Sequence, residues 1–293
     1  MGSQGRNTIR SEALVDWFRV FGRDLPWRRS RDPWLVLVSE LMLQQTQVKR
    51  VEERLPEFLK KFGTPRELAE AGPAEVITEW SGLGYNRRAL NLHRAAVQIV
   101  DGHGGSVPTD LDELLALPGV GPYTARAVRV FAFERPDGVV DTNIGRVLAR
   151  WEGRSLKPRE AQLLADQLVP PDHAWVWNQA IMELGALTCK RDPECHRCPV
   201  SSHCEWFASQ CSGPDPSHGS ASVSKPQGRF DGSDRQGRAG MVRALTTGPV
   251  SPDDLASVMG WPNDQSRAER VLESLLQDGL VVVGPDGRYR LPD

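Results

Sequence analysis

The sequence lacks the features that mark several broad protein classes. No uninterrupted apolar run approaches the roughly 18 residues that a membrane span requires, so we expect no membrane partner. The polar beginning, residues 1–5, does not have the pattern of a secretory signal. An excess of positive charge is also missing, because the formal net charge is −2. We therefore expect a cytoplasmic, nucleoid-accessible protein, in which any affinity for nucleic acid comes from local groups rather than from total charge.

Lysine is scarce beside arginine, a composition that is typical of bacteria with GC-rich genomes. The 293 residues are enough for about two domains. Between residues 10 and 211 no stretch alternates apolar and polar side chains for long enough to form a strand. Apolar residues instead recur at helical spacing, and short loops rich in glycine, proline and aspartate separate the segments. We predict helices near residues 11–22, 34–51, 52–62, 73–80, 87–101, 111–117, 122–133, 143–151, 159–168 and 172–187.

The composition changes after residue 211. Residues 212–235 consist largely of serine, glycine, proline, aspartate and glutamine, which predicts a flexible linker. Residues 236–293 form a second unit with three predicted helices and a hairpin, the pattern of a winged helix-turn-helix. Its third helix, predicted over 265–278, carries more acidic than basic side chains and suits a phosphate-lined groove poorly. We therefore favour a packing role or a protein partner for this unit over DNA binding.

Four of the five cysteines fall within sixteen residues, in the pattern Cys189-x5-Cys195-x2-Cys198-x5-Cys204. In an intracellular chain such crowding favours a metal site over disulfides. Four thiolates can hold zinc or a 4Fe–4S cluster. They leave no open position for an activated water, so we expect the metal to be structural.

One acidic residue interrupts a strongly apolar helical segment. Glu40 lies in the middle of residues 34–48, with leucine and valine on nearly every side. Burying a carboxyl group without compensation costs free energy and tends to raise its pKa. A carboxyl group that keeps its proton near neutral pH is what a general acid requires. The alternative is that Glu40 faces solvent on an amphipathic helix.

The segment 117–143 combines a tight glycine turn with a later aspartate. Gly119 and Gly121 allow positive φ and a close backbone approach, and Pro122 suits the first turn of the next helix. This pattern predicts a helix-hairpin-helix, whose turn amides and helix N-terminus suit a phosphate oxygen. Asp141 follows twenty residues after the turn and is also a good N-cap for the next helix. Together these residues are similar to the signature of the helix-hairpin-helix DNA glycosylases.

Further motifs extend this resemblance along the chain. The segments 25–28, 39–48, 80–96, 117–128 and 139–150 and the cysteine loop occur in the order found in one family. Over residues 12–207 the chain resembles the MutY-type, A/G-mismatch-specific adenine DNA glycosylases, although single motifs are shared with endonuclease III relatives. The family's cysteine spacing is usually C-x6-C-x2-C-x5-C, so the first gap here is one residue short. The resemblance implies a 4Fe–4S cluster, with zinc as the alternative.

The resemblance implies roles for four residues at the scissile bond. Glu40 would be the general acid that protonates adenine at N7 and later helps to position or activate water. Asp141 would stabilise the developing oxocarbenium sugar or its covalent adduct, and Asn143 would support this aspartate. Tyr123 stands where the endonuclease III branch has the lysine that forms a Schiff base. The tyrosine therefore implies a monofunctional enzyme that leaves an abasic site.

The resemblance also implies DNA contacts. Extracting a base requires side chains that unstack the duplex, and Gln45 and Tyr85 match the family's wedge residues, with Gln44 on the same surface. The other expected contacts are Gly119, Val120 and Gly121 in the hairpin and the basic residue Arg28. The implied partner is double-stranded DNA in which adenine is paired with 8-oxoguanine or guanine, and the implied enzyme is a monomer.

The expected fold is all-α: a two-lobed helix-hairpin-helix glycosylase with an iron–sulfur cluster loop, followed by a small winged-helix-like α+β unit. The expected parts are a six-helix barrel with the hairpin (28–134), a cluster domain (1–27 and 135–211), the linker (212–235) and the winged unit (236–293). Many relatives carry a Nudix-like domain that recognises 8-oxoguanine, and the short winged unit does not match it. Two alternatives stay open: a glycosylase of another base specificity, such as thymine opposite guanine, and a noncatalytic iron–sulfur redox protein that binds DNA.

Overall fold

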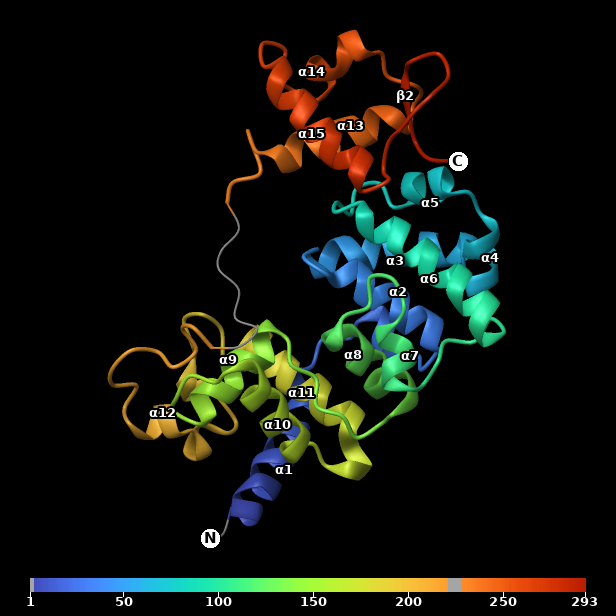
Figure 1. The fold of residues 1–293 in the computed structure, drawn as a ribbon. Coiled ribbons are helices and arrows are strands. Elements are labelled where there is room, and N and C mark those ends of the chain that lie inside the picture. The colour runs from blue at the N-terminus through green and yellow to red at the C-terminus, as the bar shows by residue number, and fades with distance from the viewer. Residues whose placement is uncertain (1–2, 221–227) are drawn as a thin grey trace. The chain divides into compact units, whose positions relative to one another are not determined.

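The computed structural model of the chain describes residues 3–220 and 228–293 (Figure 1). The chain forms two compact units. The first unit consists of residues 1–36, 109–111 and 121–226, and the second of residues 37–108, 112–120 and 227–293. Both units are helical, and the described residues contain a single pair of short strands, as predicted. No helix in this described part is long and apolar enough to cross a membrane.

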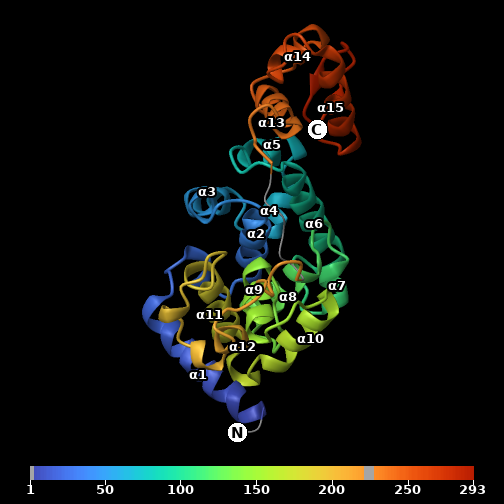
Figure 2. The ribbon, with the colours of Figure 1, turned by 90° about the vertical axis from the view of Figure 1, so that its left-hand side faces the viewer.

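The first unit is organised around α11 (Ala174–Leu187), which packs on α1 (Ser3–Phe21) and α9 (Thr142–Trp151) and also contacts α8 (Pro122–Phe133). Figures 1 and 2 show α1, α9 and α11 side by side. Each of these three helices contributes a buried side chain, namely Leu14, Val147 and Trp177, each at most 1% exposed. The remaining helices of the unit are α10 (Pro158–Leu168), which packs on α9, and α12 (Glu205–Ala208) after the cysteine loop.

The second unit contains the helices that follow the middle of α2 (Pro33–Leu43). They are α3 (Val48–Lys61), α4 (Pro65–Glu70), α5 (Pro73–Glu79), α6 (Arg87–His103) and most of α7 (Leu111–Leu115). Helices α4 and α5 both pack on α6. Phe58 and Trp80 fill the interior with an edge-to-face contact, their ring centroids 5.6 Å apart.

The C-terminal part of the second unit has the predicted winged-helix pattern. It contains α13 (Asp234–Leu245), α14 (Leu255–Val258) and α15 (Gln265–Gln277), which pack on one another. The antiparallel strands β1 (Val282–Val283) and β2 (Tyr289–Arg290) follow, with Val282 opposite Arg290. Val250, between the first two helices, pairs with Tyr289 and so ties the hairpin to the helices.

The structure differs from the sequence prediction at several points, one of which is that α4 (Pro65–Glu70) lies where no helix was predicted. The helix predicted over 34–51 is broken, because α2 ends at Leu43 and α3 begins at Val48. In addition, the beginning of the predicted linker folds onto the first unit. There Asp215 forms a 2.5 Å ion pair with Arg150, and Ser217 is 2% exposed. The linker prediction for residues 221–227 lies outside the described residues.

Candidate active site and DNA-binding surface

Glu40 lies in the apolar interior of α2. The helix buries it at 5% exposure, between fully buried Leu37 and Leu41 and next to Ser39 at 1%. The alternative that Glu40 faces solvent is therefore wrong. A carboxyl group this enclosed costs free energy to retain, which favours a chemical role over a surface role.

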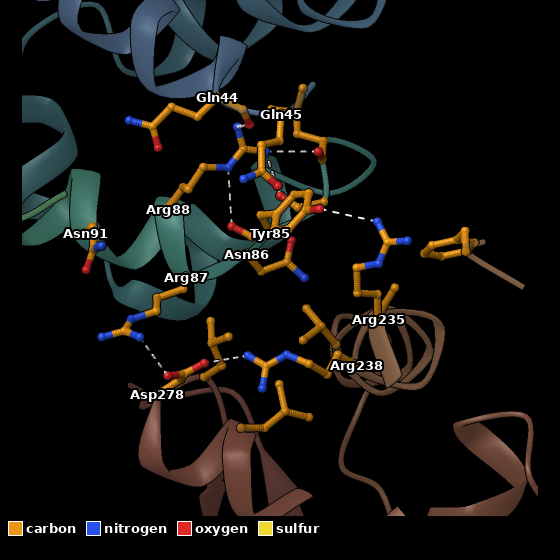
Figure 3. A pocket seen from close by; sticks show the side chains of 17 residues that line it. Gln44, Gln45, Tyr85, Asn86, Arg87, Arg88, Asn91, Arg235, Arg238 and Asp278 are labelled. Atoms are coloured by element: carbon orange, nitrogen blue, oxygen red, sulfur yellow. Dashed lines mark hydrogen bonds and ion pairs between the residues drawn. The ribbon is translucent and has the colours of Figure 1, made fainter. Parts of the chain in front are cut away.

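A short turn after α2 and a loop before α6 carry the predicted wedge residues. Gln45 in the turn (residues 44–47) and Tyr85 in the loop (residues 82–85) both adopt positive φ, at 57° and 47°. Side chains with a Cβ rarely adopt this conformation, and such strain concentrates at functional sites. Tyr85 is 41% exposed, and Gln44, Gln45 and Tyr85 line one pocket (Figure 3). The structure thus brings the two predicted wedge residues and Gln44 together.

Arg88 at the start of α6 holds the turn and the loop in place. Its side chain is buried, and the residue is 7% exposed. Its guanidinium donates at 2.6–3.0 Å to the carbonyl oxygens of Leu41, Met42, Gln44, Leu83 and Gly84 and to the hydroxyl of Thr46. One side chain therefore binds the carbonyls that precede both strained wedge residues, because Gln44 precedes Gln45 and Gly84 precedes Tyr85.

The electrostatics of Arg88 fit this bridging role. Burial lowers its pKa to about 10, and the nearby Tyr85 opposes this shift. Arg88 was not identified as a site residue from the sequence. The available signal was its position in the stripe 88, 92, 95 and 99, whose other members, Leu92, Ala95 and Ile99, are buried at helical spacing.

The predicted hairpin joins α7 to α8 with the expected turn. Gly119 has a φ of 82°, and a Cβ there would lie 2.9 Å from the Cβ of Asn91, so this position requires glycine. Gly121 caps α8 with Pro122 in the first turn. Val120 is 7% exposed, so its side chain packs inside and its backbone is the part suited to a ligand. The N-terminus of a twelve-residue helix follows, where backbone amides favour anions.

Asp141 is the N-cap of α9, as predicted. Its Oδ1 accepts a 2.7 Å hydrogen bond from the Ile144 amide, and its Oδ2 accepts a 3.0 Å bond from the Asn143 side chain. Burial raises the pKa of Asp141, while these two hydrogen bonds oppose the shift because they favour the carboxylate. The capping role and a role in chemistry are therefore compatible.

A hydrogen-bonded chain connects Asp141 to the cysteine loop. Asn143 donates to Asp141 and accepts a 2.9 Å bond from Arg146, which in turn donates to the carbonyl of Cys189 at 2.7 Å. Helices α9 and α11 approach closely here, because a Cβ on Gly185 would lie 2.6 Å from the Cβ of Asn143. Arg146 was not identified from the sequence, since nothing in its spacing indicates that it links the aspartate to the loop.

The predicted catalytic residues belong to both units. Tyr123 lies half-buried in the first turn of α8, in the unit that contains Asp141 and Asn143. Glu40 belongs to the second unit, together with the wedge residues.

The four clustered cysteines line one small cavity, together with Arg150 and Trp206. Burial raises the pKa of Cys198 to about 12 and that of Cys195 to about 11, and neighbouring cysteines add to both shifts. Arg150, 1% exposed, donates to the Cys189 sulfur at 3.3 Å. Within the described residues no three histidine, cysteine or acidic side chains are already arranged as a metal site. A thiol-only donor set around one cavity, with a buried cation beside it, nevertheless fits a group that stabilises thiolates.

Arg28 does not have the surface role predicted for it. Its side chain is 7% exposed and forms a 2.7 Å ion pair with Glu183 of α11. It also donates to Gln179 at 2.7 Å and to the carbonyl of Arg23 at 2.8 Å. The guanidinium therefore links the residues before α2 to α11. The prediction that Arg28 contacts DNA failed because Glu183 is buried in an apolar helix and requires a cation, which Arg28 supplies.

The fold and a large central segment define the class of the protein. Residues 38–171 match the HhH-GPD superfamily of base excision DNA repair proteins. The chain is similar to a solved thermostable thymine-DNA glycosylase, with a TM-score of 0.66 and 27% identity, covering 71% of this chain and all of that one. It shares its fold with endonuclease III in a trapped DNA complex, at a TM-score of 0.63 and 24% identity, covering 72% of this chain and 100% of that chain. These likenesses define a helix-hairpin-helix base excision repair protein.

Curated relatives narrow this class. The adenine DNA glycosylase of Mycolicibacterium smegmatis is 42% identical, over 97% of this chain and 96% of its own length. That of Mycobacterium tuberculosis is 39% identical, over 98% and 95%. The human enzyme is 41% identical, over 66% of this chain and 38% of its own length. The chain belongs to the family of adenine DNA glycosylases, which confirms the MutY-type resemblance.

Proposed function

We propose that the protein hydrolyses the N-glycosidic bond of adenine mispaired with 8-oxoguanine or guanine in double-stranded DNA. The observation that carries this proposal is Glu40, a carboxyl group enclosed at 5% exposure in an apolar helix. The family relationship supports adenine as the base, because the named relatives are adenine DNA glycosylases.

Glu40 acts as the general acid in this proposal. It donates its proton to N7 of the extruded adenine, and the bond between the sugar C1′ and N9 breaks as the base leaves. Water then adds to C1′ and gives a proton to the Glu40 carboxylate, which restores the acid. The products are free adenine and an abasic deoxyribose.

Asp141 stabilises the positive charge that develops on the sugar. A fixed carboxylate is effective there because it needs no reorganisation when the charge appears. The hydrogen bonds from the Ile144 amide and from Asn143 favour its charged form, against the opposing effect of burial. Asn143 is therefore a positioning residue in the proposed mechanism.

Tyr123 makes the proposed enzyme monofunctional. A phenol has no amine with which to form a Schiff base, so the strand stays intact after base release. Treatment of the reaction with borohydride should trap no covalent complex between protein and DNA. A trapped complex would contradict this part of the proposal.

The proposed DNA contacts are of two kinds. Gln45 and Tyr85 enter the duplex beside the extruded base, and Gln44 lines the same surface, which supports base flipping. The backbone amides around Gly119, Val120 and Gly121, with the N-terminus of α8, bind a phosphate.

The cysteine loop is the proposed site of a 4Fe–4S cluster, with zinc as the alternative. Cys189, Cys195, Cys198 and Cys204 would hold it, since all four line one cavity. When bound, the group supplies a thiolate-ligated crosslink of the loop. Visible absorption together with iron and sulfide analysis distinguishes the cluster from zinc.

The proposal includes a monomeric enzyme in a bacterial cytoplasm, where it reaches the nucleoid. The division into a barrel (28–134), a cluster domain (1–27 and 135–211), a linker and a winged unit stays a prediction.

A panel of duplexes tests the proposed specificity. Base release is measured from otherwise identical duplexes that contain A:8-oxoG, A:G, T:G or a damaged pyrimidine. We expect release of adenine from the first two and intact strands before alkali treatment. Activity confined to T:G would contradict the adenine assignment, and binding without any base release would favour a noncatalytic protein.

A further inference from the structure

The third helix of the winged unit is poorly suited to bind DNA. Both basic residues near the start of α15 form ion pairs with Asp234 of α13, Arg267 at 2.8 Å and Arg270 at 2.9 Å. The exposed side chains that remain include Glu269 and Glu273. These exposed acids repel a phosphate backbone.

The winged unit presents a different surface to the wedge residues. We define the wedge pocket by Gln45, Tyr85, Arg87, Arg235, Arg238 and Asp278, which lie around one cavity (Figure 3). Its volume of about 410 Å³ is within the range of cavities that accept small ligands. The lining includes four arginines, because Arg88 also borders it, against a single carboxylate. This is a local excess of positive charge in a chain whose net charge is −2.

The pocket is open to solvent and not a sealed packing interface. Tyr85 is 41% exposed and Phe230, which also lines the pocket, is 49% exposed. The Arg87 side chain is 64% exposed. Exposed aromatic rings beside arginines are the combination that nucleic acid surfaces use, because bases stack on the rings and phosphates pair with the cations.

Helix α13 places its two N-terminal arginines at this pocket. Arg235 donates to the Tyr85 hydroxyl at 3.3 Å, so it lies directly beside the wedge (Figure 3). Arg238 and Arg87 bind the two oxygens of the Asp278 carboxylate, at 2.5 Å and 3.1 Å. Two guanidinium groups that converge on one pair of anionic oxygens have the geometry that binds a phosphate. A phosphate would therefore compete with the Asp278 carboxylate for these two guanidinium groups.

From these contacts we propose that α13, rather than α15, is the DNA-contacting helix of the winged unit. Arg238, together with Arg87, binds a backbone phosphate at the place that the Asp278 carboxylate now occupies, and Arg235 binds the backbone of the same strand beside the Tyr85 wedge. The contact positions the duplex and does not read a base. This inference rests on the proposed function, since it requires that Tyr85 enters DNA.

Matched arginine substitutions test the contact in the full-length protein. Arg235→Gln and Arg238→Gln are compared with Arg243→Gln, which removes the same charge from an exposed position on α13 outside the pocket. DNA affinity is measured against salt concentration with an A:8-oxoG duplex. The two pocket variants should each lower the slope of log K against log salt by about 1 and weaken binding by about tenfold, whereas the control should leave the slope near that of the wild type. Equal slopes in all four proteins would overturn the proposal.

The Asp278→Asn variant should change DNA affinity in the opposite direction to the arginine variants, and a misfolded protein would not show such an increase. Removing the competing carboxylate should tighten DNA binding and steepen the salt dependence. Unchanged or weaker binding by a folded Asp278→Asn variant would contradict a phosphate at this position.

The base opposite adenine separates a phosphate contact from base reading. The decrease in DNA affinity caused by Arg235→Gln should be similar for duplexes with A:8-oxoG, A:G and A:C, because all three duplexes have the same backbone phosphates. A loss confined to one opposite base would overturn the phosphate assignment. Adenine release by the wild type is recorded in parallel. If release occurs while the arginine variants bind normally, only this inference fails, and if no adenine is released, the proposed function fails.

Discussion

At the scale of single residues, the site depends on polar groups that the fold holds in surroundings where they are unusual. Glu40 is enclosed by apolar side chains, Asp141 is kept ionisable by two hydrogen bonds against burial, and Arg88 is a buried cation among carbonyl oxygens. Each arrangement costs free energy that packing elsewhere offsets. Substitution of the supporting residues should therefore change function more than their distance from the substrate suggests.

The Asn143→Ala variant tests the support of Asp141. Burial already raises the pKa of Asp141, and the hydrogen bond from Asn143 opposes this shift because it favours the carboxylate. Loss of that hydrogen bond should therefore raise the Asp141 pKa further. If the carboxylate is the active form, adenine release decreases as pH falls through this pKa. The acid limb of the rate profile should move upward by about one pH unit, the equivalent of about 1.4 kcal/mol. Asn263→Ala, at an exposed position, is the control. An unshifted acid limb would show that Asn143 does not tune Asp141.

The Arg88→Lys variant tests the link between the wedge turn and the wedge loop. Lysine keeps the charge but cannot reach six acceptors with a planar fork, so Gln45 and Tyr85 lose their support. Adenine release at saturating enzyme should fall by about 10–100-fold, because misplaced positioning groups have effects of this order. Arg66→Lys, an exposed change on α4, should have no effect. A lower melting temperature with a normal release rate would mean that Arg88 only stabilises the fold.

At the scale of elements, backbone geometry determines which substitutions the hairpin accepts. Gly119→Ser should lower the free energy of unfolding by about 1–3 kcal/mol, because φ is 82° and the new Cβ meets Asn91. Gly121→Ser should change it by less than about 0.5 kcal/mol, because φ is −97°, no atom lies within 4 Å, and serine is a good N-cap. Urea unfolding compares the two variants. Equal losses would contradict the turn geometry.

A second prediction at this scale concerns the segment after the cysteine loop. The Asp215→Asn variant loses the ion pair with the buried Arg150 and should lower the free energy of unfolding by about 1–3 kcal/mol. This is less than the loss of a fully buried ion pair, because the Asp215 side chain keeps 13% exposure. The hydrogen bond and charge of Arg150 lower the pKa of Asp215. The stabilisation from this ion pair is therefore fully present above the ordinary aspartate pKa and is lost as pH falls through the lowered pKa. The exposed change Asp231→Asn is the control. If both variants unfold alike at neutral pH, the packed segment is not stabilising.

The helices were largely predictable from sequence, whereas their interruptions were not. Periodicity gave α8 at residues 122–133 as observed, since its apolar stripe and its proline start are local features. The break after Leu43 was missed because the turn in which Gln45 adopts positive φ is held by Arg88, a residue over forty positions away. Arg28 was assigned to the surface for the same reason, because its partner Glu183 is distant in sequence. Periodicity can show that such a residue is buried, but it does not show which distant residue is its partner.

At the scale of the whole molecule, the chain divides its chemistry between two units. The proposed acid and wedge residues belong to the second unit, whereas Asp141, Tyr123 and the cysteine loop belong to the first. The proposed mechanism therefore requires DNA to engage groups from both units. In the proposed mechanism Glu40 has the central role, because without a proton for the departing adenine the other residues have no reaction to assist.

The most direct measurement is the single-turnover rate of adenine release by Glu40→Gln on an A:8-oxoG duplex. Glutamine keeps the size of the side chain but cannot donate the proton, so the rate should fall by about 10²–10⁴-fold while DNA affinity is retained. Glu53→Gln, an exposed change on α3, should match the wild type. A Glu40→Gln protein that releases adenine within a few-fold of the wild-type rate would contradict the account.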